Sequence, residues 1–223
     1  MEKASKFKTI VKTISERLLE TTLTKKTKLL AVTKRRSHED IMTIYNEGHR
    51  DFGENYVPEL IEKSEKLPQD INWHLIGHLQ SNKCKKILLI KNLKLIEAVD
   101  SLKLAEELER ECFKLDRTID VLLQVNISKE ETKSGIMPEN LVELFSEMHR
   151  KMKLVRPIGI MSLGNIGNIE EFRQMFKLRE EICEKLVIDK ELFTLSFGTS
   201  DDYETAVLEG SNEVRVGGLI FDV

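Results

Sequence analysis

The feature that most constrains the fold is a regular alternation of short apolar runs and longer amphipathic stretches along the 223 residues. Runs rich in Val, Ile and Leu predict eight β-strands, over residues 28–34, 51–53, 72–77, 94–100, 119–127, 154–164, 193–198 and 213–218. Between them, apolar residues three and four positions apart predict helices, most clearly in SLKLAEELERECFKL and IEEFRQMFKLREEICEKL. The pattern predicts one α/β domain over residues 1–223, a (β/α)8 TIM barrel preceded by an extra helix over roughly residues 5–20.

Local signals at helix starts agree with this prediction. Ser37 follows the first strand with Asp40 three residues later, which is a capping-box arrangement. Pro138 is expected in the first turn of a later helix, where its missing N–H costs nothing. A doubly wound open sheet is the alternative fold. That fold would show a Gly-rich dinucleotide turn near its first strand, and the sequence has none there.

Composition narrows the classes of partner. With 35 Lys and Arg against 38 Asp and Glu, the formal net charge is -3, so no basic excess indicates nucleic acid. Cys84, Cys112 and Cys183 are far apart and odd in number, which is typical of reduced thiols in a cytosolic protein. No apolar run reaches the length of a signal peptide core or a membrane span. We therefore expect a soluble, cytoplasmic protein that binds a small molecule or another protein.

The residues that close the predicted strands are polar or small. In a barrel of this kind the functional face lies at the carboxyl ends of the strands, so these residues are candidate site residues. In chain order they are Lys34, Gly53, Glu54, Asn55, Gly77, His78, Asp100, Asn126, Met161, Ser162, Gly198, Thr199, Ser200, Gly217 and Gly218. Glycines and hydroxyls at the last two strand ends bring backbone N–H groups close to an anion, and Ser200 is expected to cap the helix that follows. The sequence predicts a phosphate site there, with ordinary turn residues as the alternative.

Lys34 has two interpretations. A lysine at a strand end is usually a solvated charge. Alternatively, its amine forms an imine with a carbonyl compound, helped by a nearby cation such as Arg36 that lowers the pKa of the amine. A lysine and a phosphate cradle on one face together favour pyridoxal 5′-phosphate (PLP), which carries both an aldehyde and a phosphate. The residue pattern alone leaves the choice open.

Other polar residues are weaker candidates. His74 and His78 are four residues apart, but the glutamate of a helical zinc motif is missing and the segment is predicted as a strand, so we predict no metal site. Lys133, in the loop after the fifth strand, is either solvated or directed towards the cofactor.

Six segments give the sequence a specific resemblance. AVTK, FGENYVPE, WHLIGHLQSNK, ETKSG, LSFGTSDDYETAVLEGS and EVRVGG occur in an order and spacing that resemble the pyridoxal phosphate homeostasis family over essentially the whole chain. The fold of that family is similar to the N-terminal barrel of bacterial alanine racemase, known as PLP fold type III. The resemblance therefore implies a protein that binds this vitamin B6 cofactor.

The resemblance also implies a role for individual residues. Lys34 is expected to form the Schiff base with PLP, and Arg215 to face the pyridine nitrogen. The other expected cofactor-binding residues are Asn55 beside the ring, His78 and Met161 on the pocket wall, and Ser200, Gly217 and Gly218 at the phosphate. Lys133 matches a loop lysine implicated in cofactor transfer.

The chain departs from the family pattern in two places near the phosphate. Phe197 and Thr199 stand where two methionines are common, and Gly218 and Leu219 stand where hydroxyl residues are common. Each lost charge-assisted hydrogen bond would weaken binding by about 1.5–3 kcal/mol unless a backbone group or water replaces it. These departures predict a looser phosphate site.

Three functions follow from these expectations. The first is a PLP carrier without dedicated enzymatic activity, which stores the cofactor and delivers it to PLP-dependent apoenzymes. The second is a racemase-like enzyme of low activity. The racemase-like enzyme is disfavoured because an arginine at the ring nitrogen makes the cofactor ring a poorer electron sink. In addition, the racemase takes a tyrosine base from a second domain, which is not expected here. Its possible substitutes, Tyr45, Tyr56 and Tyr203, lie in predicted helices and are poor replacements. The third is a cofactor-independent Schiff-base lyase, which the phosphate cradle disfavours. Because no second domain is expected to form a racemase-like dimer interface, we also expect a monomer.

Overall fold

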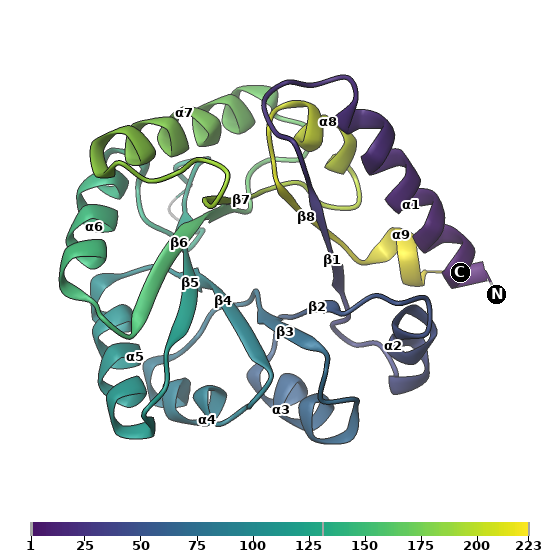
Figure 1. Cartoon of the computed structure of the whole chain (residues 1–223), viewed down its shortest axis with the longest axis horizontal. Coiled ribbons are helices and arrows are strands. Elements are labelled where there is room, and N and C mark those ends of the chain that lie inside the picture. The colour runs from purple at the N-terminus through teal and green to yellow at the C-terminus, as the bar shows by residue number, and fades with distance from the viewer. Residues whose placement is uncertain (1, 131, 223) are drawn as a thin grey trace.

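Eight parallel strands close into a barrel in which each strand pairs with its neighbours in sequence and β8 pairs with β1 (Figure 1). This computed structural model describes residues 2–130 and 132–222. The strands are β1 (Lys28–Val32), β2 (Asp51–Glu54), β3 (Asn72–Leu75), β4 (Leu93–Val99), β5 (Ile119–Val125), β6 (Val155–Ser162), β7 (Thr194–Ser196) and β8 (Glu213–Val216). The predicted (β/α)8 barrel is confirmed, and the doubly wound open sheet is wrong. Met1, Glu131 and Val223, which fall within the predicted domain and loop motif, lie outside the described residues.

Helices surround the barrel and connect consecutive strands (Figure 1). They are α1 (Glu2–Leu18), α2 (His38–Tyr45), α3 (Val57–Lys66), α4 (Cys84–Leu88), α5 (Leu102–Leu115), α6 (Pro138–Lys151), α7 (Ile169–Leu186), α8 (Tyr203–Leu208) and α9 (Gly218–Phe221), with a short 3₁₀ turn η1 (Ser81–Lys83) before α4. The extra helix before the first strand is confirmed as α1. Ser37 caps α2 by accepting a hydrogen bond from the Asp40 N–H at 3.2 Å, and Pro138 begins α6 as predicted.

Most of the predicted strands extend too far at their carboxyl ends. β1 stops at Val32, two residues before Lys34, and β8 stops at Val216, before the glycine pair. The physical reason is that these polar and small residues leave the ladder and turn into the loops of the functional face. Apolar content alone does not mark that point, because the chain is still buried as it leaves the sheet.

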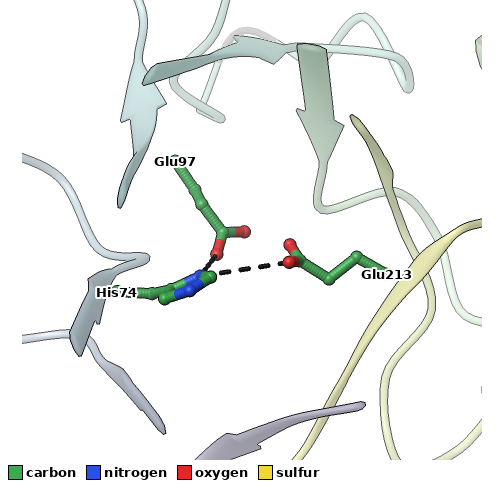
Figure 2. A group of neighbouring side chains, drawn as sticks. All are labelled: His74, Glu97 and Glu213. Atoms are coloured by element: carbon green, nitrogen blue, oxygen red, sulfur yellow. Dashed lines mark hydrogen bonds and ion pairs between the residues drawn. The ribbon is translucent and has the colours of Figure 1, made fainter. Parts of the chain in front are cut away.

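The main apolar core lies between the barrel strands and the surrounding helices, while the inside of the barrel is partly polar. Leu95, Leu122 and Met161 form a small apolar cluster inside it. The buried polar residues His74, Glu97 and Glu213 occupy another part, and Figure 2 shows their side chains pointing towards one another from three strands. No helix of residues 2–130 and 132–222 combines the length and the apolar character needed to cross a bilayer.

Candidate functional site

A cavity of about 910 Å³ opens at the carboxyl ends of the strands. It brings together six of the predicted site residues, namely Lys34, Asn55, Ser200, Arg215, Gly217 and Gly218. They come from loops and strands far apart in sequence, and closure of β1 against β8 places them around one space. The cavity therefore has an amine on one side and a group of glycines and a serine on another.

Lys34 is exposed in a tight turn directly after β1. The turn is closed by a hydrogen bond from the Arg36 N–H to the Thr33 carbonyl at 3.0 Å. The Arg36 guanidinium, which the sequence placed beside the amine, pairs with Asp222 and lies over the ring of Phe221. The expectation rested on the strand continuing through Arg36, whereas the strand ends at Val32.

Ser200 organises the predicted phosphate end of the cavity. Its Oγ accepts hydrogen bonds from the backbone N–H of Gly217 at 3.3 Å and of Leu219 at 3.5 Å. A Cβ at Gly218 would lie 3.8 Å from this Oγ and 3.0 Å from an Asp222 oxygen, so the absent side chain leaves room at this point. The expected helix cap is wrong: α8 begins at Tyr203, after Ser200 has turned towards the glycines.

The neighbouring Thr199 is already engaged. Its N–H and hydroxyl both donate to Asp202 Oδ1, at 2.7 and 3.1 Å. Gly198 before it has a φ of 94°, and a Cβ there would lie 2.4 Å from the Ala206 Cβ, so only glycine fits. The Ser200 hydroxyl accepts from two backbone N–H groups and donates to none of the described residues, so it is the side-chain donor best placed for an anion.

Asn55 is placed by a close approach of two loops. A Cβ at Gly77 would lie 2.0 Å from the Asn55 carbonyl oxygen, so the loop after β3 reaches Asn55 only because residue 77 is glycine. The Asn55 side-chain oxygen is buried and has no hydrogen-bond partner among the described residues. Buried polar atoms are almost always paired, so this oxygen fits a site completed by a polar ligand.

Arg215 lies at the floor of the cavity and is held from below. Its guanidinium donates to the Ser162 carbonyl at 2.6 Å and to Ser196 Oγ. Ser196 Oγ in turn donates to Glu97 Oε2 at 3.2 Å. Burial lowers the pKa of Arg215, and the carboxylates of Glu97 and Glu213 oppose that effect. Because arginine keeps its proton in proteins, this side chain remains a fixed cationic donor.

Below Arg215, His74 Nδ1 lies 2.7 Å from Glu97 Oε1 and 4.0 Å from Glu213 Oε2 (Figure 2). The shorter contact has the length of a hydrogen bond, whereas two ligands of a tetrahedral zinc are about 3.3 Å apart. We therefore interpret the three residues as a cluster that shares protons. His74 is buried in this cluster, whereas His78 is exposed, so the two histidines do not face one site.

The charges of this cluster are coupled. Burial disfavours a charged imidazole, but Glu97 and Glu213 together raise the pKa of His74 above its ordinary value. Burial and the nearby Glu97 raise the pKa of Glu213 to about 7. One oxygen of Glu213 has no hydrogen-bond partner in the described part of the chain. A carboxyl in such surroundings tends to keep its proton near neutral pH.

A second cavity of about 320 Å³ adjoins the first and shares Asn55, Ile76 and Leu163 with it. His78 and Lys133 line this second space. His78 Nδ1 lies 3.3 Å from an Asp100 oxygen. Lys133 Nζ donates to Glu130 Oε1 at 2.8 Å and to Ser128 and Asn165 at 3.3 Å. The structure thus places these two predicted residues beside the main cavity and not within it.

Sequence reasoning and structure differ for three groups of residues. Met161 is fully buried inside the barrel and lines neither cavity. Tyr203 lies in α8, where a tyrosine is expected to be a poor participant, but it does line the main cavity, and burial raises its pKa. The sequence predicts no site residue in the N-terminal helix, yet Ser5, Lys6, Thr9 and Ile10 of α1 line the same cavity. Strand-end reasoning does not find them because α1 precedes the first strand.

The chain, with a lysine directly after β1 and a cavity at the carboxyl ends of a closed eight-stranded barrel, falls in the class of alanine racemase N-terminal barrels. The sequence model of that family, described as "Alanine racemase, N-terminal domain", matches residues 15–223. The chain belongs to the family of pyridoxal phosphate homeostasis proteins. A relative of that name from Schizosaccharomyces pombe is 41% identical over 199 residues, which cover 86% of this chain and 82% of the relative.

Solved structures agree with this assignment. PipY of Synechococcus elongatus, in a structure with PLP bound, is 34% identical, with a TM-score of 0.78 over 93% of this chain and 99% of that one. The same protein without PLP gives a TM-score of 0.81. An alanine racemase from Clostridium difficile is 16% identical, with a TM-score of 0.72 over 95% of this chain and 57% of that one, which is a likeness of fold alone.

Proposed function

We propose that this protein binds PLP reversibly through Lys34 and serves to store the cofactor and deliver it. The observation that carries the proposal is the convergence of Lys34, Ser200 and the Gly217–Gly218 backbone on one cavity. The family membership and the PLP held by PipY support the same ligand.

The residues present fit such a ligand. When bound, PLP supplies an aldehyde that condenses reversibly with a primary amine. Lys34 would hold the aldehyde carbon, while Ser200 and the N–H groups around Gly217 would hold the phosphate. Asn55 contributes the unpartnered oxygen described above, and Arg215 would donate to the pyridine nitrogen. The space beside Gly218 accommodates a group that a side chain would otherwise fill.

The arrangement suits holding and release more than turnover. Lys34 is exposed, so water and competing amines reach it, which permits exchange. Arg215 remains cationic beneath the cavity, and a cation at the ring nitrogen disfavours protonation of that nitrogen and weakens the ring as an electron sink. We therefore propose a carrier without a dedicated enzymatic activity.

A racemase-like activity is the second candidate, and Tyr203 is the observation that favours it. This phenol lines the cavity and is a possible proton donor or acceptor. However, burial raises its pKa, so it keeps its proton at neutral pH and is a weak base. Incubation of the loaded protein with single-enantiomer amino acids, followed by chiral chromatography, separates the two functions. Sustained inversion that is lost in Tyr203→Phe would establish the enzyme and refute the carrier.

Delivery to PLP-dependent apoenzymes completes the proposed role, with the barrel over residues 1–223 acting as a single monomeric unit. Lys133 supports this step because it lines the cavity that adjoins the one lined by Lys34, where its Nζ donates to Glu130 Oε1 at 2.8 Å. Size-exclusion chromatography with light scattering tests the monomer.

The binding proposal is tested by mapping the covalent link. Purified protein is mixed with PLP, its visible absorbance is recorded, and the link is fixed with borohydride before digestion. We expect the label on the peptide that contains Lys34 and no visible band in Lys34→Ala. Lys177→Ala, which removes an exposed lysine of α7, is the matched control and should behave like the native protein. An unchanged band in Lys34→Ala would remove Lys34 from this role.

A further inference from the structure

We propose that a buried ion network of Glu54, Glu59 and Lys63, here called the Lys63 network, positions Lys34 for capture of the cofactor. The inference rests on the proposed function, because it assigns residues that act on the same amine. None of the three lines the main cavity, so they act through the turn that carries Lys34.

Lys63 is the centre of this network. It extends from α3, and only 2% of its side chain is exposed. Its Nζ donates to Glu54 Oε1 at 2.7 Å, to Glu59 Oε1 at 2.8 Å and to the Thr33 carbonyl at 2.7 Å. An ammonium has three hydrogens to donate, so every one is used. The backbone partner, Thr33, immediately precedes Lys34, which connects the buried charge to the turn.

The turn that presents Lys34 is strained. Arg35 follows Lys34 and has a φ of 59°, in the left-handed region that normally requires glycine. Such a conformation is unfavourable for a non-glycine residue and persists only where the surroundings determine it. Here Glu59 Oε1 accepts a hydrogen bond from the Arg35 N–H at 2.7 Å while also receiving Lys63. The network thus holds the strained residue in place.

The same network reaches the neighbouring strand β2, whose end carries Asn55 into the cavity lining. Glu54 is fully buried and immediately precedes Asn55, and the Thr33 hydroxyl donates to it. Burial raises the pKa of Glu54, whereas the hydrogen bonds from Lys63 and Thr33 lower it. Thr33 and Glu54 are therefore joined directly beneath Lys34 and Asn55. This connection fixes the amine and the amide relative to each other.

Stability alone is a weak explanation for this network. Taking charges out of water carries a large desolvation penalty, and buried ion pairs are often no more stabilising than apolar side chains of similar size. Contacts that meet at one strained residue beside a reactive amine fit a positioning role better, since small displacements of a reacting group slow capture strongly.

The test compares Lys63→Met and Glu59→Ala with a matched control. Lys66→Met makes the same substitution on the same helix, at an exposed lysine whose ion-pair partner is Glu62 at 2.6 Å. Two quantities are measured on each folded variant. Hydrogen exchange of the peptide that spans residues 33–36 reports the turn without any cofactor, and stopped-flow absorbance gives the rate of PLP capture.

We expect faster exchange of the turn and capture slowed by about tenfold or more in Lys63→Met and Glu59→Ala, with Lys66→Met unchanged. Lys63→Arg, which keeps the charge, should capture PLP faster than Lys63→Met does. If Lys63→Met does not fold, Lys63→Arg and Glu59→Ala together test the inference. Native exchange or native capture in both network variants would overturn the inference. If the native protein does not capture PLP but the turn still exchanges faster in the network variants, the proposed function is wrong, whereas the role of the Lys63 network in holding the turn stands.

Discussion

Replacing Glu213 with glutamine should stabilise the protein at alkaline pH and leave it nearly unchanged at acidic pH. Glu213 is fully enclosed in the barrel, where it faces Glu97 of β4, His74 of β3 and Lys28 of β1, with Arg215 on its own strand. Its pKa is about 7 in the folded protein against an ordinary value of 4.5. The folded state therefore binds this proton more tightly than the unfolded state does.

The sign and the size follow from proton linkage. Below pH 4.5 Glu213 is protonated in both the folded and the unfolded protein, so it does not change the free energy of unfolding. As the pH rises from 4.5 to 7, the unfolded protein releases this proton first, so the folded protein loses stability. Each pH unit in this window corresponds to about 1.4 kcal/mol, which gives a loss on the order of 3 kcal/mol above pH 7. Glutamine has the shape of the protonated carboxyl and does not titrate. Glu213→Gln should then gain about 3 kcal/mol at pH 8 and almost nothing at pH 5.

Urea unfolding followed by far-ultraviolet circular dichroism at pH 5 and pH 8 measures both differences. The gain at pH 8 corresponds to roughly 6–12 °C in melting temperature for a chain of this size. Glu184→Gln, which changes an exposed glutamate of α7, is the control and should show no pH-dependent difference. If Glu213→Gln destabilises the protein at pH 8, or by the same amount at both pH values, the reasoning about this carboxyl is wrong.

Three further outcomes are expected. Ser200→Ala should weaken PLP binding by roughly tenfold, because one hydrogen bond from a hydroxyl to the charged phosphate is lost. Absorbance titrations should show an unchanged affinity for pyridoxal, which lacks the phosphate. An equal loss of affinity for both ligands would mean that Ser200 does not contact the phosphate. Lys133→Ala should slow transfer of PLP to an apoenzyme without changing equilibrium binding, and equal transfer rates would exclude this role. The thiols of Cys84 and Cys112, whose pKa values burial raises to about 12 and about 11, should react with a disulfide reagent such as DTNB only on unfolding; rapid native reaction would contradict their burial.

The barrel was predictable from the sequence because each strand and helix carries its own periodic signal. Eight apolar runs, the helix cap at Ser37 and the first-turn proline Pro138 are local features, and local features define a repeated strand–helix unit. The candidate site was predictable to the extent that it follows from one rule, the position of strand ends. From that rule we expect Lys34 and Ser200 on the same face, and both line the same cavity although they are far apart in sequence.

What remained hidden depends on tertiary contacts. The approach of α1 to the cavity, the pairing of Arg36 with Asp222 and the orientation of Ser200 towards Gly217 have no periodic signature. The Lys63 network is also invisible to pattern reasoning, because a lysine between acidic residues on a helix is normally read as a solvated surface pair. Its burial appears only when the turn after β1 is folded over it.

The pairing of β1 with β8 joins residues that are almost the whole chain apart, such as Leu30 and Arg215. Lys34 lies on one side of this junction, and Arg215 and Gly217 lie on the other. A ligand held by all three would connect the first strand of the barrel to the last. Because such a ligand binds only the closed barrel, raising its concentration should selectively suppress opening at this junction.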